Sequence, residues 1–365
     1  MPTRPDGAPA ADVLRISGVA LPFEDSREIY VVDGRITYEP VGSAETVATG
    51  WVLPGLVDAH CHVGLDTGGA VDEAEQERQA LADLAAGALL VRDAGSAADT
   101  RWIDDRDDLP RIVRAGRHVA RTKRYLRNYG VEIEPTQLAG EVARQVVRGD
   151  GWVKIVGDWI DRDAGDLTPC WPADLLASAI ERAHAAGARV TVHVFGEQAV
   201  ADAVAAGVDC VEHGTGMSAE IITAMAARGI GLVPTLVNIA NFPSIADQAA
   251  RFPAYAEHIR RLHATSSQRV AEAYEAGVPV YAGTDAGGSI AHGRIVDEVI
   301  ALHEAGLPAE AALSAASWRA REWLGRAGLT EGAAADLVVY AEDPRQNLKS
   351  LHEPQRIILR GRVIR

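Results

Sequence analysis

The sequence predicts an α/β fold: a (β/α)8 TIM barrel with a small β-sandwich domain formed by the N- and C-terminal segments. Short apolar segments alternate with Ala-rich amphipathic segments, both ends of the chain are rich in β-branched residues, and polar residues cluster where apolar segments end. We expect the β-sandwich domain over residues 1–52 and 331–365, and a hydrolase-type barrel over residues 53–330.

The two ends of the chain share a pattern typical of β-strands. Residues 13–49 alternate short apolar runs with turn residues, and Asp33-Gly34 is typical of a hairpin turn. Residues 331–365 repeat this pattern in ADLVVYAED and QRIILRGRVIR. Because both ends are β-rich, we expect them to share one sheet.

Between the ends, helical segments finish in a glycine just ahead of an apolar run, which is typical of repeated βα units. The predicted strands are residues 55–63, 88–94, 111–119, 152–156, 189–195, 210–214, 231–236 and 278–284. Eight is the number that a closed parallel barrel needs. An open doubly wound sheet is the alternative, but no GxGxxG or GxxxxGK[ST] motif follows the first predicted strands.

Composition limits the partners. The chain has 365 residues, is 47% hydrophobic and carries a net charge of −15. This charge disfavours nucleic acid and anionic membranes, because a phosphate-binding face needs an excess of Lys and Arg, and no apolar stretch is long enough to cross a bilayer. We expect a small-molecule substrate; a homo-oligomer is compatible with the sequence but not required by it.

The cysteines indicate a reducing compartment. Cys61, Cys170 and Cys210 show no CxxC spacing, and the first residues lack the apolar core of a signal peptide. We therefore expect a cytoplasmic protein.

Histidines mark the end of the first barrel strand. His60 and His62 are two residues apart, so their side chains point to the same side of a strand and both imidazoles can reach one ion. Cys61 must point the other way. A lone histidine is more often a hydrogen-bonded core residue than a ligand, but further polar residues, His193, His213 and Asp285, end three other predicted strands. The C-terminal ends of barrel strands are where active sites form.

Lys154 stands inside the apolar strand WVKIV, where an unpaired ammonium would be costly to bury. It needs a partner or a modification. Pairing with Asp285 or Asp93 across the barrel is as good an explanation as any other from residue chemistry alone.

The strand-end motifs resemble those of the amidohydrolase superfamily, most closely its imidazolonepropionase-like and Xaa-Pro dipeptidase (prolidase-like) branch. The resemblance rests on the motifs PGLVDAHCH, VRDAG, VKI, EHGT and AGTDAG, and extends to the closing AADLVVY. It implies that His60, His62 and Asp285 bind a first metal ion and that His193 and His213 bind a second. Lys154, as N6-carboxylysine formed with CO2, would bridge them.

The resemblance also implies a mechanism. Two divalent ions, Zn²⁺ or else Mn²⁺ or Fe²⁺, would activate water and polarise the scissile carbonyl, and Asp285 would be the catalytic proton shuttle. Ring deaminases of the superfamily usually carry His-x-x-Glu at the fifth strand, whereas the third residue after His193 is Gly196. We therefore expect hydrolysis of an amide-like C–N bond in a dipeptide, N-acyl amino acid, carbamate or cyclic amide, as by a carbon-nitrogen hydrolase or dipeptidase.

Candidate substrate contacts follow the strands. Relatives commonly have Gly-His-Gly after the third strand, but this chain has a basic, aromatic segment whose cations could clamp a carboxylate or phosphate, or form a solvated loop. The candidate contacts are Arg121, Lys123, Arg124, Tyr125, Asn238 and His292.

Two other interpretations remain open, and a third fails. The first is a mononuclear enzyme of the cyclic amidohydrolase or deaminase type, in which Lys154 stays an ammonium. The second is a barrel that binds a small molecule without catalysis. The third is a metal-free barrel with structural histidines, which does not explain why the polar motifs all lie at the same end of their strands.

Overall fold

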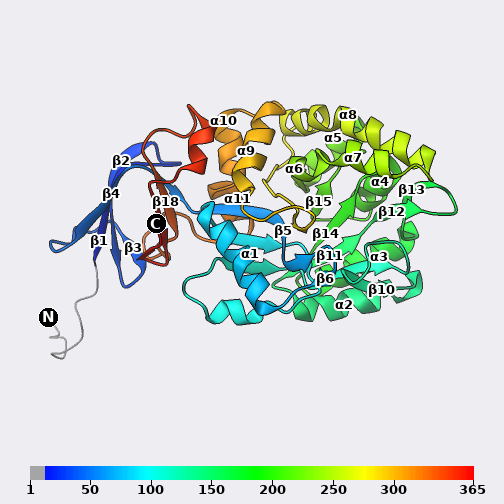
Figure 1. The fold of residues 1–365 in the computed structure, drawn as a ribbon, viewed down its shortest axis with the longest axis horizontal. Coiled ribbons are helices and arrows are strands. Elements are labelled where there is room, and N and C mark those ends of the chain that lie inside the picture. Colours follow the sequence, from blue (N-terminus) through cyan, green and yellow to red (C-terminus); the bar gives the residue numbers. More distant parts are fainter. Residues whose placement is uncertain (1–12) are drawn as a thin grey trace.

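The computed structural model describes residues 13–365. It shows an elongated molecule with a small β-rich part at one end and a larger α/β part, in which strands run through the middle and helices lie outside (Figure 1). The prediction of a missing signal peptide, and the start of the first predicted domain, fall on residues 1–12, outside the described residues.

In the part of the chain that the structure describes, the two ends form one seven-stranded sheet in the order β20-β19-β18-β4-β1-β2-β3. Its strands are β1 (Leu14–Ala20), β2 (Asp25–Val32), β3 (Arg35–Thr37), β4 (Glu45–Pro54), β18 (Leu337–Tyr340), β19 (Arg356–Leu359) and β20 (Arg362–Val363). Strand β4 pairs with β1 in parallel and with β18 antiparallel. The N- and C-terminal segments therefore share a sheet, as expected.

A two-layered β-sandwich is not confirmed. The strands belong to a single sheet, and its edge strand β3 also forms a bridge from Arg35 to Ala334, just before β18. A sheet that curls in this way can enclose its own apolar face, where Ile16, Ile29 and Leu337 are fully buried.

The α/β part contains two main sheets. The first has the order β17-β5-β7-β8, with β6 beside β5, and comprises β5 (Leu56–Asp66), β6 (Gly69–Ala70), β7 (Ala88–Asp93), β8 (Arg111–Arg114) and β17 (Ala286–Gly288). The second has the order β10-β9-β11-β14-β15-β16 and comprises β9 (His118–Arg121), β10 (Gly130–Ile133), β11 (Trp152–Val156), β14 (Arg189–Val194), β15 (Cys210–His213) and β16 (Gly231–Val233). A separate hairpin pairs β12 (Asp158–Asp161) with β13 (Asp166–Pro169).

These sheets do not form one closed eight-stranded barrel. The predicted third strand is split at Gly116, which has a φ of 73°, so that β8 and β9 belong to different sheets. The predicted eighth strand, residues 278–284, is not assigned as a strand, although the Ala59 amide donates to the Ala282 carbonyl at 2.8 Å. Pro279 in this segment has no amide hydrogen to donate, which weakens regular pairing.

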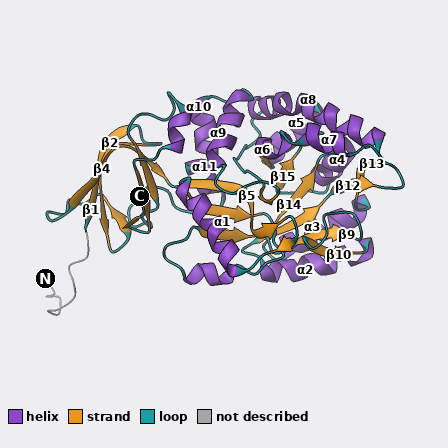
Figure 2. Ribbon diagram, viewed as in Figure 1, coloured by secondary structure: helices purple, strands orange, loops and turns teal. Residues whose placement is uncertain are grey.

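The helices enclose the strands of the α/β part (Figure 2). They are α1 (Glu73–Ala85), α2 (Leu138–Arg148), α3 (Ala173–Ala185), α4 (Glu197–Ala205), α5 (Ala219–Arg228), α6 (Leu236–Ile239), α7 (Phe242–Gln248), α8 (Pro253–Glu275), α9 (Ile295–Glu304), α10 (Ala309–Ala315) and α11 (Trp318–Trp323), with short 3-10 turns at Arg101–Asp105, Pro135–Gln137 and Leu348–His352. Capping fits the sequence: Asp72 accepts from the Glu75 amide, and α5 ends at Gly229 with a φ of 66°.

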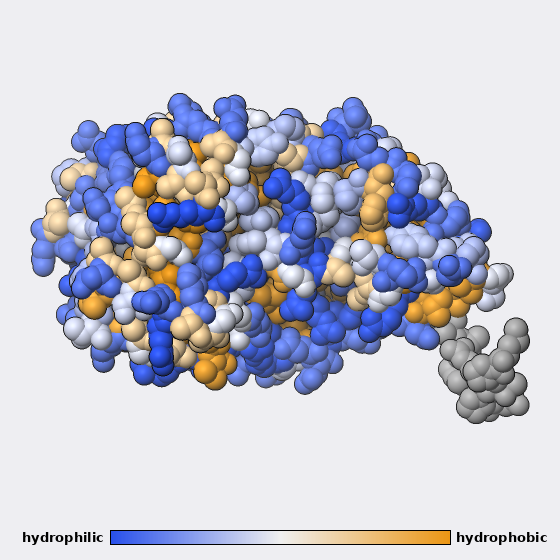
Figure 3. All heavy atoms as spheres, turned by 180° about the vertical axis from the view of Figure 1, so that it is seen from behind, coloured by the Kyte–Doolittle hydropathy of each residue, from blue (hydrophilic) through white to orange (hydrophobic). Residues whose placement is uncertain are grey.

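The face of the molecule turned away from the view of Figure 1 is mainly hydrophilic (Figure 3). On this face, apolar residues form only small, scattered patches. Among the described residues, no helix combines the length and apolar character needed to span a membrane.

Candidate active site

Strand β5 places two imidazoles beside each other. The strand is fully buried from Leu56 to Leu65, and its alternation turns His60 and His62 to one side. Their Nε2 atoms lie 3.2 Å apart. Cys61 points to the other side, where it packs in an apolar cluster with Val63 and Val91.

Asp285 completes this group. Its Oδ1 lies 2.9 Å from Nε2 of His62 and 3.1 Å from Nε2 of His60. The ligand atoms of His60, His62 and Asp285 all lie within 4.8 Å of one another. Two imidazole nitrogens and a carboxylate oxygen that converge in this way are a donor set suited to a divalent transition metal.

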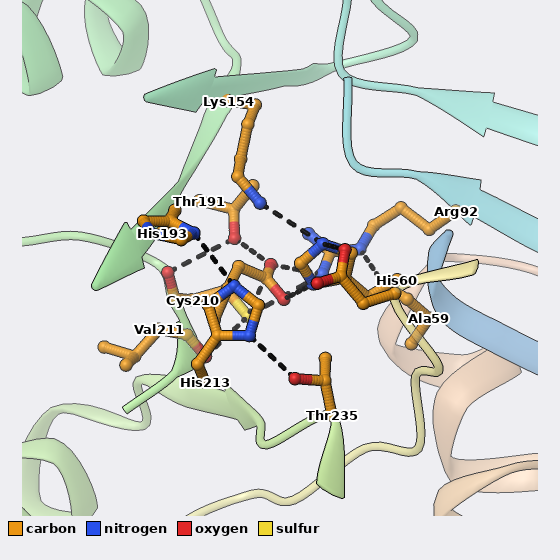
Figure 4. Close-up of polar contacts among 12 residues, drawn as sticks. Ala59, His60, Arg92, Lys154, Thr191, His193, Cys210, Val211, His213 and Thr235 are labelled. Atoms are coloured by element: carbon orange, nitrogen blue, oxygen red, sulfur yellow. Dashed lines mark hydrogen bonds and ion pairs between the residues drawn. The ribbon is translucent and has the colours of Figure 1, made fainter. Parts of the chain in front are cut away.

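A second pair of imidazoles faces the first group. His193 lies on β14 and His213 ends β15, and Nδ1 of His193 is 3.0 Å from Nε2 of His213. Lys154 points from β11 into the space between the histidines, with its Nζ 3.4 Å from Nε2 of His60 (Figure 4). The structure thus gathers all six predicted ligands at one place.

Outer partners orient the ligand rings. Nδ1 of His60 contacts Glu212 Oε2 at 2.6 Å, Nδ1 of His62 contacts the Gly95 carbonyl at 2.7 Å, and Nδ1 of His213 contacts Thr235 Oγ1 at 2.7 Å. Each ring therefore has its Nε2 free to face the centre. Bonding of the other ring nitrogen is what fixes metal-binding histidines in proteins.

Glu212 is part of a buried charged network. Oε1 of Glu212 accepts from Arg92 on β7 and from Thr191, and both Arg92 and Glu212 are fully buried. Burial alone would raise the pKa of Glu212, but Arg92 and His60 hold this pKa well below its usual range. Arg92 in turn lies over Trp152, with its guanidinium carbon 4.7 Å from the ring centroid.

Three residues of the site have a strained backbone. His213, Thr235 and Asp285 have φ values of 69°, 49° and 60°, in the left-handed region that residues other than glycine rarely adopt. Each such residue costs on the order of 1–3 kcal/mol. At His213 the unusual φ breaks the strand alternation, so that the consecutive side chains of Glu212 and His213 both reach the site.

Burial and neighbouring charges shift the pKa values of the candidate ligands in different directions. Burial lowers the pKa of His62, and that of His213 to about 3, so that these rings are neutral. Burial and Lys154 also act to lower the pKa of His60, but Glu212 and Asp285 raise it above its usual value. Burial opposes the ionisation of Asp285, but His60 and hydrogen bonds from both histidines hold its pKa well below its usual range. Burial also lowers the pKa of Lys154.

A pocket of about 350 Å³ opens onto these groups, with His62, His193 and Asp285 at its base. Its walls are largely aromatic: Tyr125, Tyr129, Trp159, Phe195, Phe242 and Tyr255. Among the described residues that line it, none is Lys or Arg. The pocket therefore suits an apolar, uncharged group.

Sequence comparison decides the family. A model described as "Amidohydrolase family" matches residues 51–364. The chain belongs to the amidohydrolase family. Hydrolytic chemistry follows from this membership. Uncharacterized proteins of Mycobacterium tuberculosis and Mycobacterium bovis are each 57% identical to this amidohydrolase over 352 residues, which cover 96% of this chain and 95% of the relative.

Solved structures share the fold. A Xaa-Pro dipeptidase with bound methionine has a TM-score of 0.82 at 22% identity and covers 96% of this chain and 99% of its own. A prolidase complexed with N-methylphosphonate-L-proline has a TM-score of 0.81 at 22% identity, with 97% and 99% covered. A. niger ochratoxinase has a TM-score of 0.80 at 19% identity, with 97% and 96% covered. The fold is that of prolidase-like amidohydrolases.

Two of the predicted substrate contacts lie on the pocket of this amidohydrolase. Tyr125 forms part of the aromatic wall, and Asn238 lies beside Asp285, to whose Oδ2 it donates from Nδ2 at 2.7 Å. Both can touch a molecule bound in the pocket.

The other predicted contacts do not line this pocket. Arg124 is buried, and it donates to Asp161 Oδ2 at 2.9 Å and to the Trp159 carbonyl at 2.8 Å, because the β12–β13 hairpin packs against it. Arg121 donates to the Cys170 carbonyl and Lys123 is exposed. His292 is turned toward Asp83, with Nδ1 to Oδ2 at 2.8 Å.

Several residues of the site carry no signal in the sequence alone. Glu212 and Thr235 act on ligands from neighbouring strands, and Phe242 and Tyr255 reach the pocket from α7 and α8. Only the position of Thr235 near the end of the predicted strand 231–236 could have indicated a role. The aromatic wall depends on long-range packing.

Proposed function

We propose that the chain is a metal-dependent amidohydrolase that cleaves an amide-like C–N bond of a small molecule. His60, His62 and Asp285 would hold one divalent ion, and His193 and His213 a second. The convergence of ligand atoms within 4.8 Å at the base of a pocket carries this proposal. Zn²⁺ suits a set rich in neutral imidazoles, with Mn²⁺ or Fe²⁺ as alternatives.

Lys154 would bridge the ions as N6-carboxylysine. Its side chain is buried and forms no ion pair with a carboxylate among the described residues, and the lowered pKa favours the neutral amine. That amine can add CO2: a new N–C bond forms, one proton is lost to water, and an anionic carbamate results. The modification would replace a costly buried cation with oxygen donors.

Bound ions of this kind lower the pKa of water and polarise the scissile carbonyl. The residues of the chain do the remaining work. Asp285 accepts a proton from the attacking water and passes it to the leaving nitrogen as the C–N bond breaks. The amide of Asn238 holds Asp285 Oδ2, which fixes the carboxylate in the orientation for this transfer.

The pocket sets the substrate class. A dipeptide, N-acyl amino acid, carbamate or cyclic amide fits the proposed chemistry, and the aromatic wall favours those with an apolar, uncharged group on the side of Tyr125 and Trp159. Solved proteins of the same fold include a Xaa-Pro dipeptidase, whose name states a dipeptide substrate.

Further features of the proposal follow from the fold. We propose that the two α/β sheets correspond to a (β/α)8 barrel interrupted at Gly116 and at residues 278–284, over residues 53–330, with the terminal domain over 1–52 and 331–365. Cys61, Cys170 and Cys210 are free and buried, which suits a reducing compartment such as the cytoplasm.

The test is hydrolysis by protein reconstituted with Zn²⁺ or Mn²⁺, using N-acyl aromatic amino acids, aromatic dipeptides and aryl carbamates. We expect release of the amine product, its loss on chelation and its return when metal is added back. No hydrolysis of any compound by protein shown to hold metal would favour a binding protein instead.

A further inference from the structure

A second cavity lies away from the active site. It has a volume of about 490 Å³, larger than the substrate pocket. Its lining includes Leu90, Ile112 and Arg321, and Arg321 donates from Nε to the carbonyl of Gly55 at 2.8 Å. These contacts lie near the beginnings of β5, β7 and β8, at the opposite end of the strands from His62 and Asp285.

The lining is strongly cationic. Six arginines and three aspartates face this cavity: Arg101, Arg111, Arg114, Arg321, Arg326, Arg360, Asp104, Asp150 and Asp336. In a chain with a net charge of −15, a surplus of three positive charges, six minus three, around one cavity is unusual. Arginine forks match carboxylate and phosphate oxygens.

Part of this charge is already neutralised. Arg101 and Arg114 pair with Asp150 at 2.6 and 3.3 Å, and Arg114 also pairs with Asp104 at 3.1 Å. These two arginines and two aspartates therefore form a closed ion-pair network on one side of the cavity.

The other four arginines have no such partner. Within residues 13–365, the guanidinium groups of Arg111, Arg321, Arg326 and Arg360 have no carboxylate oxygen within 4.0 Å. The charge of Asp336 acts on both Arg321 and Arg360, and the backbone amide of Arg360 donates to Asp336 Oδ1 at 2.8 Å. The surplus of charge is thus concentrated on these four side chains.

Two of them also have side-chain nitrogens without a hydrogen-bond partner among the described residues. Arg321 is buried, and its Nη2 has no partner among the described residues. The same holds for Nε and Nη1 of Arg360. Leaving buried cationic donors unpaired is costly, and burial accordingly lowers the pKa of both arginines. An anion in the cavity would supply the counter-charge that these four guanidinium groups lack.

We propose that this cavity binds a small multivalent oxyanion, a phosphate group or a dicarboxylate, separately from the active site. Arg360 comes from the turn between β19 and β20 and donates from Nη2 to the carbonyls of Arg106 and Leu109, so it already joins the terminal sheet to the α/β part. A bound anion between Arg360 and Arg321 reinforces this junction.

The test is calorimetric titration of the metal-loaded, full-length protein with inorganic phosphate and, separately, with succinate. Binding of either one supports the proposal, and which one binds identifies the oxyanion. Arg111 and Arg326 are exposed, so the double variant R111Q/R326Q should fold normally. We expect it to bind at least about tenfold more weakly, because two of the four guanidinium charges without a carboxylate partner are removed from the cavity lining.

The matched control is Arg319→Gln, which removes an exposed arginine from α11 that does not line the cavity. It should bind like the unaltered protein. Binding of neither probe would overturn the proposal. So would equal affinity in R111Q/R326Q and the unaltered protein, because the anion would then be held elsewhere, for instance in the active site.

Discussion

The two halves of the candidate metal site differ in how complete they are. On one side, the ligand atoms of His60, His62 and Asp285 lie within 4.8 Å of one another. On the other, only Nδ1 of His193 and Nε2 of His213 meet, at 3.0 Å, with no carboxylate between them. The first half is a full donor set in the folded chain, whereas the second needs an anionic donor that an unmodified Lys154 does not supply.

The supports of the two halves differ as well. Glu212 holds His60 with a charge that Arg92 balances, while a neutral hydroxyl of Thr235 holds His213. We therefore expect changes to the first half to have larger effects than changes to the second.

Asp285→Asn should have the largest effect. The amide cannot take a proton from water, so kcat should fall by about 10³-fold or more, near the upper end of what acid-base catalysis contributes. Steady-state kinetics at matched metal content measures this. Asn238→Ala is the comparison: it removes only the contact to Oδ2 and should cost far less. Equal losses in the two variants would contradict the shuttle role.

Glu212→Gln should weaken both the fold and the first metal site. It leaves Arg92 buried without its counter-charge, which costs roughly 3–5 kcal/mol, and it should reduce metal affinity by about 10–100-fold. Denaturant unfolding and metal titration measure the two effects. If stability were unchanged, the Arg92–Glu212 pair would not have the role assigned to it.

Thr235→Ala should affect the second half alone. Loss of the contact to His213 Nδ1 should weaken one metal equivalent by about 10-fold while the other is retained. Thr235→Ser keeps the hydroxyl and should bind both ions. Weakening of both equivalents in the Ala variant would show that the halves are not independent.

Glu298 links the two halves through the turn that carries Thr235 and Asn238. Its carboxylate accepts from the amides of Leu236 and Val237 at 2.9 and 2.8 Å, and burial raises its pKa from 4.5 to about 8. The folded state therefore binds the proton more tightly than the unfolded state. The contribution of Glu298 to the stability of the fold is therefore fully present below about pH 4.5 and is lost as the pH rises to about 8.

Glu298→Gln should flatten this dependence. Between pH 5 and 8 the free energy of unfolding should fall less steeply with pH than in the unaltered protein. The two slopes should differ by at most about 1.4 kcal/mol per pH unit, the contribution of one proton. Unfolding curves across this range measure the slope. An unchanged slope would mean that Glu298 stays ionised in the folded protein.

Lys123→Gln should have the smallest effect. Lys123 is exposed and does not line the pocket, so KM for any substrate should change less than about twofold. A large change in KM in the Lys123→Gln variant would support the hypothesis, drawn from the sequence, that the basic segment binds a substrate carboxylate.

Trp159→Leu removes an aromatic ring from the pocket wall. It should raise KM for an aromatic substrate by about 10-fold.

The residues of the candidate metal site could be predicted from the sequence because their convergence depends on local rules. Two-residue alternation brings His60 and His62 together, and strand ends meet at one edge. The basic segment could not be interpreted in this way, since the partners of Arg124 come from a hairpin about 35 residues further along. The same is true of Glu212, whose contact with His60 spans 152 residues.

The fold shows the same division. Alternation and glycine positions predicted most strands of the α/β part, and the β-rich ends predicted a shared sheet. The split at Gly116 and the irregular segment 278–284 depend on how neighbouring strands pair. This pairing cannot be predicted from a local sequence pattern. The number of layers in the terminal domain likewise depends on how one sheet curls.

Metal content and intact mass of the protein purified from metal-supplemented culture test the central claim most directly. The account predicts about two divalent ions per chain and an added mass of one CO2 that is absent from Lys154→Met. One ion per chain and no added mass would leave only the His60, His62 and Asp285 half as a metal site, and would contradict the bridged pair.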